Sequence, residues 1–551
     1  MDERTVPPLG MTGDQFKKAA TSTISDIENY YTTLPDRQVV PSISPGYLRK
    51  LLPPSPPETG EEWYAIKADM ETKILPGVTH WQSPKFMAFF SANSTYPSIL
   101  GETWSAALTA PAFNWICSPV VTELETIVLD WLAQALALPP TFTSQTHGGG
   151  VIQGSASEAI VVCMVAARER YIRRHLSART FATDEDREDA ACILRSQLVA
   201  LGSDQSHSST AKAALIAGTR YRSIPCTQRT NFSLTGAALR SKILQLQSRG
   251  LHPYYLTVTL GTTGTCAIDD FASIAAVKHD FPSIWIHVDA AYAGAALILP
   301  QYQQHLSPQL SPFDSFNTNL HKWLLVNFDA SCLWVQERSD LTTALSITPS
   351  YLQNSYTDSG LVTDYRDWQI PLGRRFRALK VWFVMRTFGV KGMREHVGRH
   401  IRFGESFAGW VRGRGDLFGF LAEPAFALSV IFVRPFGEDS GGGFGWRELR
   451  GGDPRPDWDG EKSFEPVVPE GDEELAEANR LTRRVFERVD EGKEFFLTSS
   501  VIGGVFGIRV VSASPLAEEK YLRRCFDVLV EAAEGVLRER DQGKVNRESG
   551  P

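Results

Sequence analysis

One lysine in this chain stands at the start of a continuous apolar run, and that position restricts the folds and chemistry open to it. Residues 314–334 read DSFNTNLHKWLLVNFDASCLW, with Lys322 directly before Trp323, Leu324 and Leu325. Poor solvation disfavours the charged ammonium, lowers the pKa of a lysine and makes its amine nucleophilic. Such an amine can form a Schiff base with an aldehyde. A lysine whose ammonium reaches solvent from the end of a buried strand would give the same pattern. Other residues must therefore decide between a reactive lysine and an ordinary one.

Four polar residues follow predicted buried strands at the points where those strands end. Residues 120–345 alternate apolar strands with helices, which indicates a mostly parallel sheet covered by helices on both faces. The four residues are His207, Thr263, Asp289 and Lys322. Carboxyl ends of parallel strands meet at one edge of the sheet, where ligands bind. His207 alone could be a loop histidine and Asp289 alone a helix cap, but their shared position favours one site.

A glycine-rich segment precedes a predicted helix in the same region. HGGGVIQG (147–154) reads as a turn, and Ser155 and Glu158 have capping-box spacing at the start of the helix. Glycines let backbone N–H groups converge, and a helix N-terminus arranged in this way binds phosphate. The pattern is neither GxGxxG nor a Walker A loop, which argues against dinucleotides and nucleoside triphosphates.

An aromatic segment lies near the N-terminus. Residues 79–98 contain Trp81, Phe86, Phe89 and Phe90 among serine, asparagine and proline. These rings could belong to the core. Their density in a loop-forming context favours instead an aromatic surface that contributes to a pocket for a flat ligand.

Composition limits the class of protein. The 551 residues are 43% hydrophobic, with 56 basic against 63 acidic residues and a net charge of −7, which argues against nucleic acid or an anionic membrane as the main partner. The seven cysteines are scattered and lack CxxC spacing, so they read as reduced thiols, with neither a disulfide framework nor a metal site. The absence of an apolar leader or a membrane-length apolar stretch makes the cytoplasm the expected location.

The chain divides into three predicted regions. Residues 1–80 hold proline-broken amphipathic helices that lack a core of their own and are expected to pack on a partner subunit. Residues 81–380 form the large domain, which includes a polar stretch at 350–372 that reads as a loop of functional length. Residues 381–551 form a smaller α+β domain, and its glycine-rich insertion at 437–462 is expected to be disordered.

Eight ordered motifs extend over nearly the whole chain. They are PGVTHWQSP (76–84), SPVVTELETIVLDWL (118–132), GGGVIQGSASEA (148–159), SDQSHSS (203–209), TLGTT (259–263), HVDAAYAG (287–294), HKWLLVNFD (321–329) and SGLVTDYRDWQIPLGRRFRALK (359–380). In order and spacing they resemble the group II pyridoxal-phosphate decarboxylases, specifically the aromatic L-amino acid decarboxylases. The resemblance implies a type I aminotransferase-like fold, a homodimer and pyridoxal 5′-phosphate as cofactor.

The resemblance also implies roles for individual residues. Lys322 would carry the cofactor as a Schiff base, Asp289 would pair with its ring nitrogen, and His207 and Ala291 would lie on its two faces. The phosphate ligands would be Ala156, Ser157, Asn319 and His321, with Thr263 beside the ring. His207 would also contact the substrate, whose pocket would include Trp81, Phe89 and Phe90. Tyr365 would lie on a closing loop and return a proton to the substrate.

The implied activity is decarboxylation of an aromatic L-amino acid to its amine and CO2. Where animal relatives carry proline, this chain has Leu320; where animal DOPA decarboxylases carry tyrosine, proline and threonine, it has Phe89, Ser91 and Ala92. These departures argue against a preference for a catechol and leave tryptophan, tyrosine and phenylalanine open as substrates, within an aromatic class that also includes DOPA. An oxygen-using aldehyde synthase on the same scaffold is the alternative, although such enzymes typically replace Tyr365 or His207. A non-catalytic binding homologue is disfavoured by the presence of Lys322.

Overall fold

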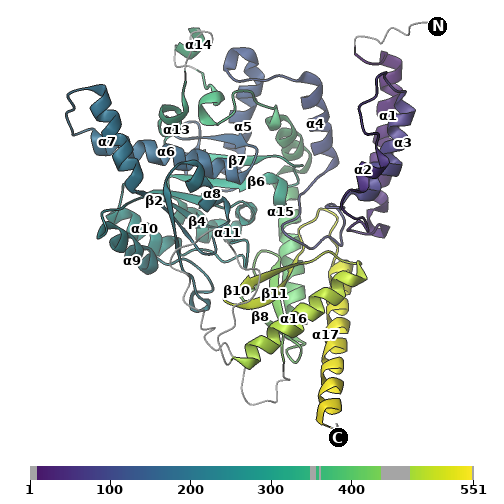
Figure 1. The fold of residues 1–551 in the computed structure, drawn as a ribbon. Coiled ribbons are helices and arrows are strands. Elements are labelled where there is room, and N and C mark those ends of the chain that lie inside the picture. The colour runs from purple at the N-terminus through teal and green to yellow at the C-terminus, as the bar shows by residue number, and fades with distance from the viewer. Residues whose placement is uncertain (1–8, 348–354, 359–361, 436–471, 549–551) are drawn as a thin grey trace.

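A central sheet of seven strands organises the molecule (Figure 1). The structure is a computed structural model that describes residues 9–347, 355–358, 362–435 and 472–548. The strands are β1 (Gly149–Gln153), β2 (Leu198–Ser203), β3 (Arg220–Ile224), β4 (His252–Thr259), β5 (Trp285–Asp289), β6 (Ser315–Asn319) and β7 (Ser331–Val335). They lie in the order β1-β7-β6-β5-β4-β2-β3. The pairs from β6 to β3 are parallel, and β7 is antiparallel to both β6 and β1. Every strand except β7 therefore runs in one direction, which confirms the mostly parallel sheet.

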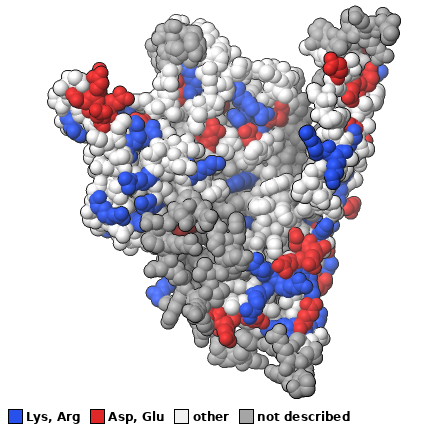
Figure 2. Space-filling view, viewed as in Figure 1, with Lys and Arg blue, Asp and Glu red and all other residues white. Residues whose placement is uncertain are grey.

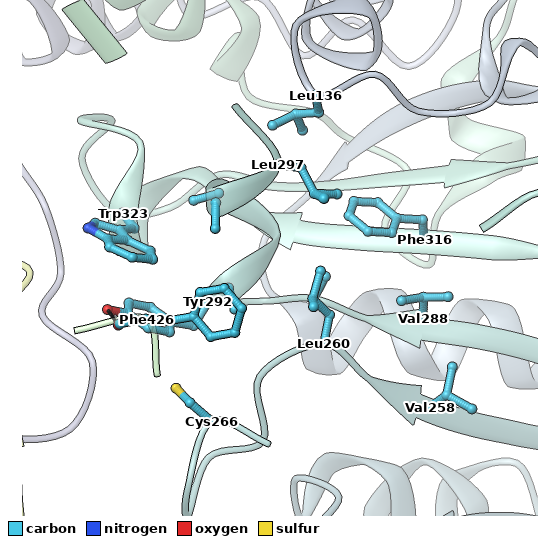
Figure 3. Packing of buried hydrophobic residues seen from close by; sticks show 14 of the residues in the cluster. Leu136, Val258, Leu260, Cys266, Val288, Tyr292, Leu297, Phe316, Trp323 and Phe426 are labelled. Carbon is cyan, nitrogen blue, oxygen red and sulfur yellow. Dashed lines mark hydrogen bonds between the residues drawn. The ribbon is translucent and has the colours of Figure 1, made fainter. Parts of the chain in front are cut away.

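Helices cover both faces of this sheet, because alternate strand residues enter two different cores. Val199 and Leu201 of β2 belong to the larger core, whereas Leu198 and Ala200 of the same strand belong to the other. The larger core packs against α5 (Pro119–Ala135), α9 (Gly236–Gln247), α10 (Phe271–Asp280) and α15 (Arg377–Arg412). The second packs against α6 (Ala156–Leu176), α7 (Asp184–Gln197), α8 (Ser209–Ile216) and α13 (Arg338–Leu345). Figure 3 shows part of the larger core, where Val258, Val288 and Phe316 project from neighbouring strands.

The glycine-rich segment corrects one prediction. Gly149–Gln153 forms strand β1 and pairs with β7, so residues 147–154 are not simply a turn. A Cβ on Gly148 would lie 1.9 Å from the carbonyl oxygen of Thr141, and one on Gly150 would lie 2.8 Å from Trp334. These glycines are needed for close packing of β1 against its neighbours. The helix signal was correct, since α6 begins at Ala156 after the Ser155 cap.

A smaller antiparallel sheet forms the C-terminal part. Its strands, in the order β10-β11-β9-β8, are β10 (Thr498–Ile502), β11 (Val505–Val511), β9 (Leu428–Val433) and β8 (Phe418–Phe420). It packs against α16 (Glu473–Gly492) and α17 (Glu519–Glu548), and α15 connects it to the large sheet. The predicted small α+β domain is confirmed as a fold. The insertion at 437–462 lies outside the described residues.

The N-terminal arm, which we define as residues 9–77, differs from the rest of the chain. Its helices α1 (Gly13–Thr33), α2 (Tyr47–Leu51) and α3 (Trp63–Asp69) contain no buried residue. Apolar side chains such as Phe16 and Tyr64 are 63% and 77% exposed. Figure 1 shows the arm standing beside the body of the molecule near α4 (Tyr96–Leu108).

The remaining described helices are short: α11 (Pro300–Leu306), α12 (Leu320–Trp323) and α14 (Ser355–Asp358). None of the helices within the described ranges combines the length and apolar character needed to cross a bilayer. On the face in Figure 2, basic and acidic side chains are interspersed, and an acidic group marks the tip of α7.

Candidate active site

Four predicted site residues meet at one edge of the central sheet. Strands β2, β4, β5 and β6 are consecutive parallel neighbours, so their carboxyl ends lie side by side. Asp289 is the last residue of β5, and His207 and Thr263 each follow the end of their strand by four residues. Lys322 lies three residues after the end of β6. The topology thus confirms the shared position expected from the sequence.

Lys322 lies in the single turn α12, between His321 and Trp323, which are both buried. Its ammonium nitrogen is 5.5 Å from the centre of the Phe90 ring. Desolvation lowers the pKa of Lys322, and the negative charge of Asp289 opposes this shift only in part. A lysine with a lowered pKa supplies a larger fraction of the neutral amine near neutrality, which is the form that attacks a carbonyl carbon.

Asp289 is buried and fixed at the end of its strand. Its Oδ1 accepts a hydrogen bond from the Ala291 N–H at 3.1 Å. The Ala291 carbonyl in turn accepts from the Asn319 N–H at 3.0 Å, which joins the end of β5 to the end of β6. These contacts hold a carboxylate between the two strand ends, in a position to attract a cationic group in the pocket.

The N-terminus of α6 opens at the same edge of the sheet, because β1 runs parallel to β6. Ser155 caps the helix by accepting from the Glu158 N–H, and Glu158 accepts from the Gly154 N–H. Ala156 and Ser157 occupy the first turn, where backbone N–H groups have no acceptor within the helix. Those groups are suited to an anion such as phosphate.

His321 lies beside these groups. Its Nδ1 is 2.9 Å from the Ala330 nitrogen and 3.0 Å from the Ala330 carbonyl oxygen, so Ala330 engages Nδ1 in either tautomer. Burial, followed by the charge of Lys322, lowers the pKa of His321 to about 4. The ring is therefore neutral at physiological pH. Beside it, the side-chain oxygen of buried Asn319 has no hydrogen-bond partner among the described residues.

His207 and Thr263 lie at the solvent-exposed mouth of the site. The His207 Nδ1 accepts from the Ser209 N–H at 3.2 Å and lies 2.8 Å from the Ser209 hydroxyl. The carbonyl of Thr263 accepts from the Arg509 guanidinium at 2.8 Å. Because Arg509 belongs to β11, this bond links the mouth of the site to the small domain.

The aromatic segment divides into two parts. Trp81 and Phe89 are partly exposed, and their rings stack with centroids 5.8 Å apart, as expected for an aromatic surface. Phe86 and Phe90 are buried, so the prediction of a surface position was wrong for both. Phe90 nevertheless faces the site, because it stacks on Tyr292 at 3.8 Å while Lys322 lies over its ring.

Tyr365 does not join the group around Lys322 in this structure. It lies in a 3-10 turn and is only 3% exposed, so the expectation of a loop position for this residue was wrong. Its hydroxyl is 2.9 Å from the Thr126 hydroxyl of α5, and its ring packs against Trp368 and Arg374. Burial raises the pKa of the Tyr365 phenol. Most of the stretch 350–361 lies outside the described residues.

Two buried polar residues at the site were missed by the sequence analysis. The Arg509 guanidinium lies 5.4 Å from the centre of the Phe90 ring. Asn93 is hydrogen-bonded to the carbonyl of Lys322. Arg509 carried a detectable signal, namely a charged residue inside the apolar strand VFGIRVV. Asn93 carried none, because it stands in a loop where asparagine is common.

Comparison with known proteins matches this arrangement to one family. Residues 45–433 fit the model of the pyridoxal-dependent decarboxylase conserved domain. The chain is 44% identical to aromatic-L-amino-acid decarboxylase of Cavia porcellus over 404 residues, which cover 73% of this chain and 82% of the relative. It is 37% identical to phenylacetaldehyde synthase of Arabidopsis thaliana over 530 residues, covering 96% of this chain and 97% of the relative. The crystal structure of Oryza sativa TDC with PLP and tryptamine superposes with a TM-score of 0.85 at 33% identity, covering 97% of this chain and 100% of that one.

Proposed function

Because the chain belongs to the pyridoxal-dependent decarboxylase family, we propose that it converts an aromatic L-amino acid to the corresponding amine and CO2. The observation that carries this proposal is the Lys322 amine, with its lowered pKa, at the carboxyl edge of the sheet beside Asp289. Pyridoxal 5′-phosphate, when bound, supplies an aldehyde for an amine and a ring that accepts electrons from the bond that breaks. The protein must hold that group, orient the substrate and control protons.

The residues present fit this cofactor. The first turn of α6, with Ala156 and Ser157, offers backbone donors for the phosphate, and His321 offers Nε2, the ring nitrogen that Ala330 does not engage. The side-chain oxygen of Asn319 beside them has no hydrogen-bond partner among the described residues. The amide can be turned so that its NH2 group faces an anion instead. Asp289 supplies the negative charge that holds a proton on a ring nitrogen.

Substrate recognition is proposed for the aromatic segment and His207. The Trp81 and Phe89 pair offers a flat apolar surface at solvent, and Phe90 forms the floor beneath the Lys322 amine. An aromatic side chain would gain from edge or stacked contacts with these rings. We propose that His207, which is exposed, contacts the substrate and one face of the cofactor, and that Ala291 and Thr263 form the other walls.

We also retain Tyr365 as the proposed proton donor to the substrate Cα after CO2 leaves. In that role the segment that carries it must move away from α5, where Thr126 now holds the hydroxyl. The same stretch contains Tyr351, outside the described residues, and Tyr356, whose ring is 4.8 Å from Trp115. A comparison of phenylalanine variants at these positions can identify the donor.

An oxygen-using aldehyde synthase is the second candidate. It is supported by the relative from Arabidopsis thaliana, a phenylacetaldehyde synthase that matches almost the full length of both chains. That reaction would consume the amino acid, O2 and water, and release aldehyde, CO2, ammonia and hydrogen peroxide. The two candidates differ in whether the substrate Cα is protonated before oxygen reaches it.

We propose that the working protein is a cytoplasmic homodimer. The N-terminal arm exposes Phe16, Ile24, Tyr64 and Ile66, and α4 beside it exposes Trp104. Apolar surface of this kind is stabilised when a second subunit covers it. All seven cysteines are free, as suits a reducing compartment.

One assay distinguishes the candidates. Purified protein with pyridoxal 5′-phosphate is incubated with tryptophan, tyrosine, phenylalanine and DOPA in turn, and amine, aldehyde and peroxide are measured. Amine and CO2 in equal amounts, without peroxide, are expected. Aldehyde with peroxide as main products would favour the second candidate, and no turnover of any of the four would contradict both.

A further inference from the structure

Asn93 makes an unusual set of hydrogen bonds to the turn that carries the reactive lysine. It is buried, and its Nδ2 donates to the carbonyl of Lys322 at 2.9 Å and to that of Ala513 at 3.0 Å. Its Oδ1 accepts from the Leu325 N–H at 3.3 Å. Its own N–H donates to the carbonyl of His321 at 2.6 Å. Asn93 therefore contacts α12, the second residue after it, Leu325, and the segment that follows β11.

The turn that these bonds hold is too short to fix its own position. Helix α12 has four residues, and its N-cap residue, Asn319, makes no side-chain capping bond. Its end is closed by a bond from the Leu324 N–H to the Leu320 carbonyl. A single helical turn is unstable without outside contacts. The position of the Lys322 backbone is consequently set by neighbours such as Asn93.

The carboxamide of Asn93 is suited to this task in one orientation only. Two backbone carbonyls face its NH2 group and one backbone N–H faces its oxygen. If the amide were rotated by half a turn, its oxygen would face the two carbonyl oxygens, and neither could form a hydrogen bond with it. Side chains without two donors and one acceptor cannot satisfy the same three groups.

The same loop also supports the amine end of the lysine. Phe90, three residues before Asn93, stacks on Tyr292 at 3.8 Å, and Tyr292 stacks on Trp323 at 4.6 Å. Figure 3 shows Tyr292 and Trp323 lying face to face beside α12. Residues 90–93 thus contact Lys322 below its amine and at its carbonyl.

We infer that Asn93 is a positioning residue, which places the Lys322 amine in the pocket and makes that placement depend on the small domain through Ala513. The inference deepens the proposed function and rests on it only in taking Lys322 as the reacting amine. If the bond network is lost, the lysine gains freedom and solvent contact, and its reactivity changes without any change in the groups that touch the substrate.

The test compares Asn93→Ala with Asn479→Ala as a matched control. Asn479 is also buried, and its carboxamide bridges the Gly504 carbonyl at 3.1 Å and the Phe506 N–H at 2.7 Å inside the small domain. In cofactor-free protein, competitive labelling with acetic anhydride across a pH series gives the titration midpoint of Lys322. With cofactor, kcat, KM and trapping by borohydride at Lys322 are measured.

We expect Asn93→Ala to move the Lys322 labelling midpoint upward and to lower kcat about tenfold or more, with a smaller effect on KM. Asn479→Ala should lose about as much resistance to urea unfolding as Asn93→Ala. It should leave the Lys322 labelling midpoint and kcat unchanged. If Asn93→Ala does not fold, Asn93→Ser, whose hydroxyl offers one donor in place of two, replaces it. Equal midpoints and equal kcat in the Asn93 and Asn479 variants would overturn the inference. Failure of borohydride to trap cofactor at Lys322 in the unmodified protein would instead contradict the proposed function.

Discussion

The pocket around Lys322 and the N-terminal arm stand at opposite extremes of this molecule. The site around Lys322 lies at the carboxyl ends of four neighbouring strands, and backbone groups contact its buried polar side chains, as at Asp289 and His321. The arm has three helices without a buried residue. Both are parts of one chain, but the arm buries few side chains, among them Leu34 and Val39.

This difference shows where each region derives its stability. Burial of apolar surface is the main favourable term in folding, and the arm obtains little of it within one subunit. Its contacts with the body include the bond between the Tyr30 hydroxyl and His80 at 3.0 Å. The arm is therefore the region whose order we expect to depend most on a second subunit.

The largest effect is expected from the centre of the pocket. Lys322→Ala removes the only group proposed to attach the cofactor, so turnover should fall to the background rate. Borohydride should fix the cofactor to Lys322 in the unmodified protein, as peptide mass spectrometry would show, and to no residue in the variant. Exposed Lys391→Ala serves as the control. Full activity in Lys322→Ala would exclude the assignment.

Deletion of residues 1–75 should have the next largest effect, and it examines the other side of the comparison. Loss of the arm removes the contacts proposed for a second subunit and leaves Trp104 of α4, which is already exposed, without a partner surface. We expect insoluble or inactive protein. Light scattering of the full chain should give the mass of a dimer, and a fully active monomer at working concentration would refute the assembly.

Tyr365→Phe should change the product rather than abolish the reaction. If Tyr365 protonates the substrate Cα, its loss leaves time for oxygen to react, and aldehyde, ammonia and peroxide should appear at the expense of amine. Cofactor affinity should be little changed. Thr126→Val is the control, because it removes the same hydrogen bond and keeps the phenol. Wild-type amine and no peroxide in Tyr365→Phe would transfer the role to Tyr351 or Tyr356, to be tested in the same way.

Acid should weaken the buried region of the pocket. Burial lowers the pKa of His287 and His321 to about 4 and that of His400 to about 3. Below pH 6.5 the unfolded chain binds protons that the folded chain does not, so folding stability falls as pH drops. As the pH falls from 7 to 5, each of these histidines should lower the free energy of unfolding by about 2 kcal/mol. Burial raises the pKa of Asp269 to about 7, so its carboxyl is protonated over the same interval and the folded state becomes more stable. This gain offsets the loss from about one histidine.

Urea unfolding at pH 7 and pH 5 measures this loss. His287→Gln should reduce the loss of unfolding free energy between pH 7 and pH 5 by about 2 kcal/mol, the contribution of one histidine. Replacement of His279, which is 91% exposed, should leave it unchanged. Equal stability at both pH values in the unmodified protein would contradict the assignment of buried neutral histidines.

The smallest effect is expected outside both regions. Replacing residues 438–462 with a short Gly/Ser linker should leave kcat within a few-fold, because a segment rich in Gly, Asp, Arg and Pro cannot bury enough apolar surface to offset its ordering entropy. Complete loss of activity with an intact far-ultraviolet circular dichroism spectrum would show that the insertion has a function.

The sequence was sufficient for the parts of the fold that follow from periodicity. Apolar strands followed by polar residues predicted the edge at which Asp289 and Lys322 meet, because side-chain pattern and chain direction determine that arrangement. It was insufficient for strands without such a pattern. Strand β3 (Arg220–Ile224), a partly exposed edge strand with two arginines, gave no apolar signal. The domain boundaries at 80 and 380 and the roles of the site residues stay predictions.

Side-chain placement was the second limit. Nothing in the local sequence distinguishes buried Phe90 from half-exposed Phe89, since their positions depend on Tyr292 and Phe496, which are distant in the chain. Tyr365 was read as a loop residue from its polar neighbours. Its burial depends on Thr126 and Arg374, and on the ion pair between Arg374 and Glu125 of α5.

Gly148, directly before β1, and Gly150, within it, have a consequence for how variation in this protein should be interpreted. At Gly148 and Gly150 even a methyl group would collide with backbone or with Trp334. A saturation screen would find these positions as intolerant as Lys322, and their closeness in sequence to a phosphate-type helix start would invite a catalytic explanation. The structure predicts a different signature: alanine there should reduce the amount of folded protein, while the molecules that do fold retain normal specific activity. Intolerance of substitution at these positions would then reflect a lack of space for a side chain. Measuring the amount of folded protein together with its specific activity would distinguish this steric effect from a catalytic one.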